Sequence, residues 1–255
     1  MDLVDSHCHL DVPAFDGDRP EVLARARAAG VRRIVVPAIS AAGWDRLDRV
    51  CSSDPGLFAA YGLHPMFLDE HRPAHLDALA LRLRNGAAVA VGECGLDHFV
   101  PGLDRPSQLR YFIAQLELAR EARLPVIIHA RRAVDEVTAA IRRIGGLRGV
   151  VHSFSGSRQQ AQVLWDLGFL IGLGGPVTWP RAQRLRRLAA TMPLECLLVE
   201  TDAPDQPGCD RRGERNEPGH LREVLDTIAD LRGEDPARIA AATTANAERL
   251  FQLGS

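Results

Sequence analysis

A rhythm that repeats along the chain is the feature that most constrains its fold. Short apolar segments rich in β-branched residues alternate with longer amphipathic segments rich in Ala, Leu and Arg. The apolar runs are nearly continuous, which is typical of parallel strands covered by helices on both faces. The predicted strands are 2–8, 31–38, 57–63, 87–93, 125–129, 148–153, 169–174 and 196–202. The predicted helices are 19–29, 42–53, 72–85, 105–123, 133–145, 158–168, 181–191, 217–232 and 236–252.

Strand–helix units in this succession predict an α/β fold, the TIM (β/α)8 barrel. The 255 residues suit one barrel of ordinary size, and no linker or low-complexity stretch divides them. We therefore expect a single barrel domain over 1–255. The alternative is an open, doubly wound parallel sheet.

The composition excludes several classes of protein and several kinds of active site. All 31 basic residues are Arg, and with 33 acidic residues they give a formal net charge of -2. This near neutrality excludes a broadly basic nucleic-acid coat and a highly charged disordered chain. The sequence has no lysine, which excludes a Schiff-base lysine, a P-loop lysine and a carboxylated lysine bridging two metal ions.

Cysteine usage and hydropathy bear on the compartment. The five cysteines are odd in number and form no CxxC pair, so we expect no disulfide framework. The acidic N-terminus is unlike a signal peptide, and no apolar stretch approaches the roughly 18–20 residues that span a bilayer. We expect a cytoplasmic protein with no membrane segment and no obligate protein partner.

Polar side chains gather at the predicted carboxyl ends of the strands, where the active site of a TIM barrel lies. Five of the nine histidines stand there. His7 and His9 are two residues apart on the first predicted strand, so alternation places them on the same face. The strand ends supply these candidate ligands: His7, His9, Glu93, His129, His152 and Asp202.

The make-up of this set predicts a metal site. Imidazole nitrogens and carboxylate oxygens together suit Zn²⁺, Mn²⁺ or, with water completing the shell, Mg²⁺. A single histidine of this kind is more often a hydrogen-bonded core residue, and Asp202 alone is equally a turn residue before Pro204. Burying so many ionisable groups without a cation would cost several kcal/mol for each group.

The two carboxylates have separate predicted tasks. On the predicted barrel, Glu93 stands between the first-strand histidines and the His129 and His152 pair, so it can bridge two ions. Asp202 ends the last strand, beside the first strand of a closed barrel. It can ligate one ion and accept the proton of the attacking water.

In these motifs the chain resembles the TatD family of metal-dependent deoxyribonucleases, within the wider metal-dependent hydrolase barrels. The resemblance covers essentially the whole chain, and its motifs keep their order. They are Val4-Asp5-Ser6-His7-Cys8-His9, Gly62-Leu63-His64-Pro65, Gly92-Glu93-Cys94-Gly95-Leu96-Asp97, Ile127-Ile128-His129-Ala130-Arg131, Glu200-Thr201-Asp202-Ala203-Pro204 and Arg215-Asn216-Glu217-Pro218. The segment 205–212 departs from the family pattern, which leaves the choice of substrate open.

The resemblance implies a TIM-like barrel of the metal-dependent hydrolase type with up to two divalent ions (Mg, Mn or Zn). It implies that one ion is held by His7, His9 and Asp202. It implies that Glu93 bridges and that His129 and His152 hold the second ion. All of these positions are intact in the sequence.

Three residues outside this ligand set are predicted to contact substrate. His64 can hydrogen-bond a scissile phosphate or a leaving group, although it equally shapes the loop before Pro65. Arg131 lies two residues beyond His129 and would share its face, where a guanidinium binds phosphate bidentately. Arg215 follows the last predicted strand on the rim of the site and is a candidate phosphate contact.

The leading functional prediction is a divalent-metal-dependent hydrolase that cleaves phosphodiester bonds. The resemblance narrows this to a TatD-like DNase of the 3′–5′ exonuclease type that uses a metal-activated water. Its catalytic residues would be Asp202 as general base, Glu93 and His64. With only 5% aromatic residues, contact with nucleic acid should be short and directed at single-stranded or 3′ ends of DNA, or the substrate is a small phosphodiester.

Two other functions remain open from the sequence. A metal-dependent amidohydrolase or esterase acting on a small or cyclic substrate would use the same ligands on the same fold. A non-catalytic metal-binding or scaffold protein is the third hypothesis. The intact ligand set argues against it.

Overall fold

The computed structural model describes residues 1–254, and its strands and helices follow the predicted order. The strands are β1 (Leu3–Asp5), β2 (Val31–Pro37), β3 (Leu57–Tyr61), β4 (Ala90–Asp97), β5 (Val126–Arg131), β6 (Gly149–Val151), β7 (Phe169–Leu173) and β8 (Leu197–Val199). The helices are α1 (Arg19–Ala28), α2 (Trp44–Cys51), α3 (Pro73–Arg84), α4 (Arg105–Ala122), α5 (Val134–Ile144), α6 (Arg158–Asp166), α7 (Gln183–Thr191), α8 (Leu221–Arg232) and α9 (Pro236–Phe251). Every predicted strand and helix is confirmed, with ends that differ by a few residues.

The strands belong to one sheet in the chain order β1 to β8, and the registered pairs are parallel. The longest strand is β4, which continues to Asp97 instead of ending near residue 93 as the sequence analysis expected. Its far end pairs with β5, where Gly95 is opposite His129 and Asp97 is opposite Arg131. The extension carries an additional carboxylate to the end of the strand.

The chain divides into two compact units. Unit 1 contains Met1–Val36, Val50–Phe58 and Ile171–Ser255, and unit 2 contains Pro37–Arg49 and Ala59–Leu170. The predicted single domain over 1–255 therefore stays a prediction, and each unit is described by itself.

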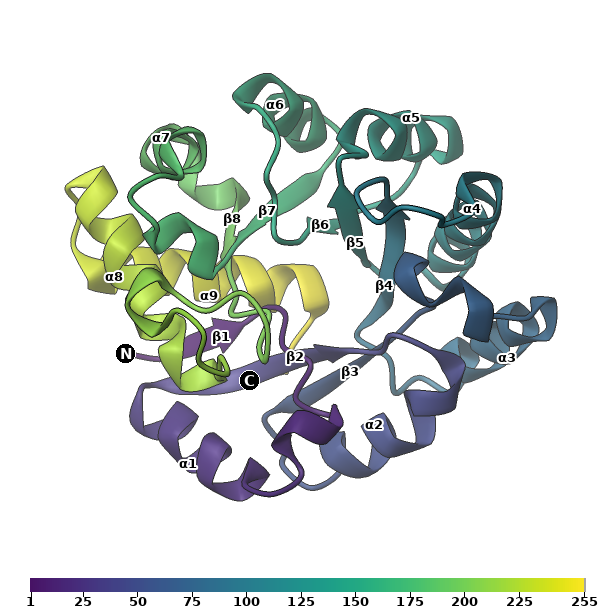
Figure 1. The fold of residues 1–255 in the computed structure, drawn as a ribbon, viewed down its shortest axis with the longest axis horizontal. Coiled ribbons are helices and arrows are strands. Elements are labelled where there is room, and N and C mark those ends of the chain that lie inside the picture. Colours follow the sequence, from purple (N-terminus) through teal and green to yellow (C-terminus); the bar gives the residue numbers. More distant parts are fainter. Residues whose placement is uncertain (255) are drawn as a thin grey trace. The chain divides into compact units, whose positions relative to one another are not determined.

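In unit 1, α9 packs against β1 and β8 (Figure 1). Its buried Asn246 donates from Nδ2 to the carbonyl oxygens of Leu194 (2.8 Å) and Leu197 (2.9 Å), which fixes the approach to β8. Asp235 caps the start of α9 by accepting a hydrogen bond from the Ala237 amide. An aspartate before a proline-initiated helix is a common start signal, which explains why the sequence located this helix closely.

In unit 2, α4 lies along β4 (Figure 1). Two buried glutamines on α4 hold backbone segments of the strand ends. Gln108 accepts from the Asp97 amide (2.8 Å) and donates to the Asp97 carbonyl (3.0 Å). Gln115 accepts from the Leu63 amide (2.7 Å) and donates to the Leu63 carbonyl (3.1 Å). Each side-chain amide thus satisfies both polar groups of one residue next to the candidate site.

Two glycines allow strands of unit 2 to approach closely. A Cβ at Gly95, whose φ is +147°, would lie 2.0 Å from the carbonyl oxygen of His129. A Cβ at Gly62 would lie 2.6 Å from the carbonyl carbon of Gly92, directly before Glu93. Any side chain at either position would displace a residue of the candidate site.

Among residues 1–254, no helix is long and apolar enough to cross a membrane.

Candidate metal centre

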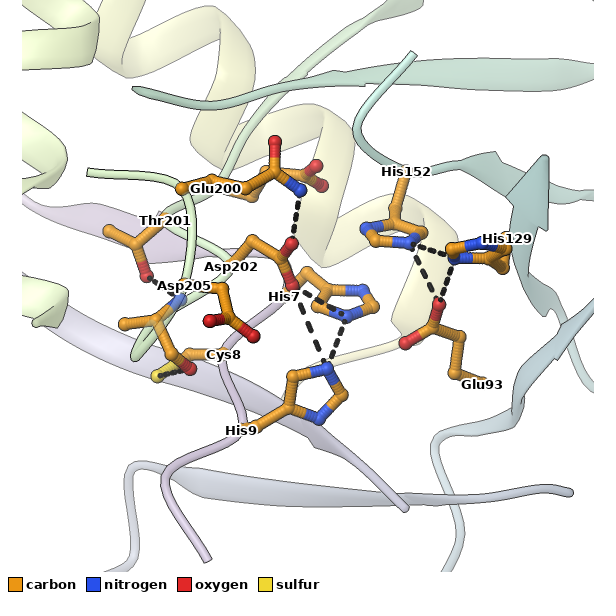
Figure 2. A network of polar contacts seen from close by, with 12 residues as sticks. His7, Cys8, His9, Glu93, His129, His152, Glu200, Thr201, Asp202 and Asp205 are labelled. Atoms are coloured by element: carbon orange, nitrogen blue, oxygen red, sulfur yellow. Dashed lines mark hydrogen bonds and ion pairs between the residues drawn. The ribbon is translucent and has the colours of Figure 1, made fainter. Parts of the chain in front are cut away.

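Each unit contains one cluster of histidines and carboxylates. The His7 cluster of unit 1 consists of His7, His9 and Asp202. The Glu93 cluster of unit 2 consists of His64, Glu93, His129 and His152. Figure 2 shows the side chains of each cluster, apart from His64, pointing toward one another.

The His7 cluster brings two imidazole nitrogens and one carboxylate oxygen together. The Nε2 atoms of His7 and His9 are 3.2 Å apart. Asp202 Oδ1 lies 3.4 Å from Nε2 of His7 and 3.6 Å from Nε2 of His9. His7 is fully buried, and the other two side chains are about one-tenth exposed.

Backbone pairing beyond the strand ends places these residues. β1 ends at Asp5, so the predicted strand alternation of His7 and His9 is wrong, although their side chains do converge. The His9 amide donates to the Ala203 carbonyl (2.8 Å), and the Asp202 amide donates to the His7 carbonyl (2.9 Å). These hydrogen bonds continue the contact between the β1 and β8 segments after both strands have ended.

Asp202 is held in an unusual backbone conformation. Its φ is +56°, in the left-handed region that non-glycine residues seldom occupy. Gln206 donates from Nε2 to Oδ2 of Asp202, while Oδ1 faces the two imidazoles. Such strained residues are found preferentially at functional sites, where surrounding contacts hold them.

A further carboxyl group, that of Asp5, is hydrogen-bonded to the backbone of the His7 cluster. Asp5 is fully buried and accepts hydrogen bonds from the Thr201 amide (3.0 Å), the Thr201 hydroxyl (2.6 Å) and the His7 amide (3.2 Å). Burial raises the pKa of Asp5 to about 7, and these hydrogen bonds oppose that shift. Asp5 thereby fixes the backbone on which His7 stands.

In the Glu93 cluster, one carboxylate oxygen meets three histidines. Oε1 of Glu93 lies 2.8 Å from Nε2 of His152, 2.9 Å from Nδ1 of His129 and 3.0 Å from Nε2 of His64. Nε2 of His152 and Nδ1 of His129 are 3.4 Å apart. Glu93 is 1% exposed, so its charge is almost completely withdrawn from water.

Asp97 orients His129. Its Oδ2 lies 2.9 Å from Nε2 of His129, so the neutral ring carries its proton there and turns the Nδ1 lone pair toward Glu93 and His152. Burial favours protonated Asp97, but hydrogen bonds from His129 and from the Val100 and Phe99 amides prevail and lower its pKa to about 2. Burial lowers the pKa of His129. The protonated ring, however, donates from Nε2 to Asp97 and from Nδ1 to Glu93, and these hydrogen bonds outweigh burial and raise the pKa.

His64 has the opposite arrangement of ring nitrogens. The Met66 amide donates to Nδ1 of His64 (3.2 Å), so the neutral ring carries its proton on Nε2 and donates it to Glu93. The His64 backbone is also held, because His71 Nε2 donates to its carbonyl oxygen (2.9 Å). In this tautomer His64 presents a proton, while His129 presents a lone pair.

The donor atoms of both clusters suit a divalent cation, and the spacing of the His7 cluster can be compared with a metal site directly. Ligand atoms around a tetrahedral Zn²⁺ with bonds of about 2.0–2.1 Å lie about 3.3–3.4 Å apart. The separations in the His7 cluster, 3.2 to 3.6 Å, fall around this value. The nitrogen and oxygen donors equally suit Mn²⁺ or, with water, Mg²⁺. The ligand residues predicted from the sequence thus lie in two sets, each of which converges.

The two arginines predicted to contact substrate are placed differently. Arg131 ends β5 with its guanidinium 3.7 Å from the centroid of the exposed Phe99 ring. Arg215 donates to both carboxylate oxygens of Asp18 (2.8 and 2.6 Å) and to the Ala14 carbonyl (2.6 Å). This pairing gives Arg215 a structural task, and its predicted substrate contact stays a prediction.

Sequence reasoning gave no role to Asp97, Gln108 or Gln115. A signal for Asp97 was present, because Glu93 and Asp97 are four residues apart and share a face if the strand continues. For the glutamines the signal was a pair of polar residues seven apart on one helical face. That pattern alone does not distinguish a buried polar face from an exposed one.

The fold and the two clusters define a class: a metal-dependent hydrolase with the α/β barrel fold that the sequence predicts. The family model described as TatD related DNase matches residues 4–252, and the chain belongs to this family. A crystal structure of YjjV, a TatD homolog from Escherichia coli K12, superposes with a TM-score of 0.93 at 40% identity, covering 98% of each chain. The predicted barrel is thereby confirmed.

Two curated relatives match at full length. The metal-dependent hydrolase YjjV of Escherichia coli (strain K12) is 42% identical over 253 residues, covering 98% of both chains. The 3′-5′ ssDNA/RNA exonuclease TatD of Salmonella typhimurium is 36% identical over 259 residues, covering 98% of this chain and 99% of the relative. The predicted family and enzyme class are confirmed by these matches.

Proposed function

We propose that the protein hydrolyses phosphodiester bonds at the 3′ end of single-stranded nucleic acid, with two divalent ions as cofactors. The observation that carries the proposal is the convergence of ligand atoms in both clusters. The relative named as a 3′-5′ ssDNA/RNA exonuclease supports the choice of substrate.

We propose one ion for each cluster. His7, His9 and Asp202 hold the first, and Glu93, His129 and His152 hold the second. Bound divalent ions polarise phosphoryl oxygens and lower the pKa of water. The bridging role of Glu93 and the identity of the metal stay predictions.

The side chains of this protein have distinct tasks in the proposed reaction. Asp202 accepts a proton from the attacking water, and Gln206 keeps its carboxylate in place. His64 holds a proton on Nε2, where a departing oxygen can receive it. The Glu93 side chain lies at the centre of three imidazoles and so sets their orientation.

A substrate panel tests the proposed function. The metal-free protein is reconstituted separately with Mg²⁺, Mn²⁺ and Zn²⁺. It is then given single-stranded DNA with a 5′ label, bis-p-nitrophenyl phosphate, a lactone and a cyclic amide. We expect stepwise shortening of the DNA from its 3′ end and hydrolysis of bis-p-nitrophenyl phosphate. Turnover of only the lactone or amide would replace the proposal by an amidohydrolase or esterase, and no turnover at all would favour a metal-binding protein.

We further propose that the protein acts in the cytoplasm. None of the five cysteines, all within residues 1–254, forms a disulfide, and Cys8 and Cys94 are buried, as suits a reducing compartment. Cell fractionation with an antibody against the chain checks this, and recovery outside the cytoplasmic fraction would contradict it.

A further inference from the structure

Two guanidinium groups lie against an exposed aromatic ring in unit 2. Phe99 is 44% exposed, which is unusual for a phenylalanine that follows a buried strand. Cζ of Arg131 lies 3.7 Å from the centroid of its ring, and Cζ of Arg132 lies 4.7 Å from it. We call Phe99, Arg131 and Arg132 the Arg–Phe platform.

The cationic charge of the platform is not neutralised within residues 1–254. Over this range no carboxylate lies within ion-pair distance of Arg131 or Arg132, and neither guanidinium donates a hydrogen bond to another residue of the range. The two acidic residues in the first turn of α5 have other partners. Asp135 accepts from Gln160 (2.8 Å), and Glu136 lies 3.5 Å from Nε2 of His98.

A cation–π contact holds a guanidinium without using its hydrogen-bond donors. The contact is electrostatic attraction to the ring face, whereas the five N–H groups point outward in the plane of the guanidinium. Two guanidiniums held in this way present up to ten donors and two positive charges. Phosphate oxygens are the partners that this geometry fits best.

The backbone beneath the platform is fixed in place. Arg132 has a φ of +55°, in the left-handed region, two residues before α5 begins at Val134. The His98 amide donates to the Arg131 carbonyl (2.8 Å), which joins the segment after β4 to the end of β5. The platform therefore lies at the adjoining ends of β4 and β5, where hydrogen bonds hold the backbone.

One carboxylate joins the platform to the Glu93 cluster. Oδ1 of Asp97 accepts from the Phe99 amide (2.8 Å), while Oδ2 is 2.9 Å from Nε2 of His129. Along β5, Arg131 is two residues beyond His129. The phosphate-binding donors thus begin directly beside a predicted metal ligand.

We propose that the Arg–Phe platform binds the phosphate of the nucleotide next to the scissile bond and makes the enzyme prefer a polynucleotide to an isolated phosphodiester. The inference rests on the proposed function and adds a subsite to it. A second phosphate exists in a strand but not in bis-p-nitrophenyl phosphate. The contact with a second phosphate is therefore available to one substrate and not to the other.

The test compares two double variants with the same change in charge. Arg131→Gln with Arg132→Gln alters the platform, and Arg142→Gln with Arg143→Gln alters the exposed pair in the last turn of α5, the helix that follows the platform in the chain. Binding of a phosphorothioate single strand, which resists cleavage, is measured by fluorescence anisotropy over a range of salt. Turnover is measured on single-stranded DNA and on bis-p-nitrophenyl phosphate.

For the platform variant we expect the Kd for the strand to rise at least about 10-fold, as when a charge-assisted hydrogen bond is removed. The slope of log K against log salt should fall by about 0.7 for each phosphate that the variant no longer binds. Turnover of bis-p-nitrophenyl phosphate should fall by a smaller factor than turnover of single-stranded DNA, because this diester has no second phosphate. The control variant should bind the strand like the original protein.

Three outcomes would overturn the inference: unchanged strand binding in the platform variant, equally weakened binding in the control variant, or a parallel decrease in turnover of bis-p-nitrophenyl phosphate. Phe99→Leu adds a second check, since it keeps an apolar side chain but removes the ring. We expect it to weaken strand binding about 2- to 5-fold. Because binding is measured without cleavage, absence of nuclease turnover with platform-dependent binding would contradict the proposed reaction and leave the subsite standing.

Discussion

The His7 cluster and the Glu93 cluster use the same side-chain types but are built in different ways. The His7 cluster takes its residues from two segments that have already left their strands, and backbone hydrogen bonds join those segments. The Glu93 cluster takes its residues from four successive strand segments: Glu93 and His129 lie within β4 and β5, whereas His64 and His152 follow β3 and β6. Its rings are oriented by specific partners, Asp97 for His129 and the Met66 amide for His64.

The geometry of the two clusters has different structural origins. In the His7 cluster, the path of the backbone, including the left-handed conformation of Asp202, sets the positions of the side chains. In the Glu93 cluster, position follows from a side-chain network with two buried carboxylates, Glu93 and Asp97. The network can therefore be weakened in steps by single substitutions.

The largest effect is expected for Glu93→Gln. The substitution removes the charge that three imidazoles share, so turnover should fall by more than the roughly 10²–10⁴-fold contribution of a general base. Activity and bound metal are measured together, with Glu121→Gln on the exposed side of α4 as the control. Loss of both ions would support a bridge, loss of one would contradict the bridge, and full metal content with full activity would contradict the cluster.

Asp202→Asn should lower turnover by roughly 10²–10⁴-fold at saturating metal, because an amide cannot accept the proton. Isothermal titration with Mn²⁺ should also show weaker binding at one site only, since the Glu93 cluster keeps all of its residues. Unchanged turnover at saturating metal would remove Asp202 from the role of general base.

Asp97→Asn should weaken metal binding by about 10- to 100-fold, as is usual when a histidine ligand loses its orienting partner. The His129 ring would lose the acceptor that fixes its tautomer, which nitrogen NMR of the imidazole can follow in the metal-free protein. Asp104→Asn, at the exposed N-cap of α4, is the matched control. Equal metal affinity in the two variants would contradict the orienting role.

The lowered pKa of Asp97 predicts how the stability of the metal-free protein changes in acid. Its pKa of about 2 lies below the ordinary value of 3.8, so the folded state binds fewer protons than the unfolded chain between these values. Its stabilising contribution is present above about pH 4 and is lost as the pH falls toward 2. The free energy of unfolding of Asp97→Asn should fall less between about pH 4 and about pH 2 than that of the original protein. An identical acid transition in the two proteins would contradict this prediction.

The smallest effect is expected for Arg215→Ala. Arg215 is paired with Asp18 on the surface of unit 1, and an exposed pair of this kind contributes little. The melting temperature should fall by no more than about 3 °C. The salt dependence of strand binding distinguishes the two roles of Arg215. An unchanged slope agrees with the pairing, whereas a lower slope would support the substrate contact predicted from the sequence.

The strands, the helices and the metal ligands followed from the sequence because their signals are local. Apolar runs and helical periodicity record which faces are buried, and helix starts such as Asp104 and Asp235 lie beside the helices they cap. The predicted ligands were recognisable because histidines and carboxylates after apolar strands have few other uses. Even so, the reason given for His7 and His9 was wrong, since the strand ends before them.

Only the tertiary structure decided which polar groups meet. Asp97 faces His129 across 32 residues of chain, Gln115 holds Leu63 across 52, and Arg215 pairs with Asp18 across 197. The Arg–Phe platform likewise depends on the register between β4 and β5. Periodicity reports burial but not partners, because a hydrogen bond or cation–π contact requires two side chains whose separation in space the local sequence does not encode.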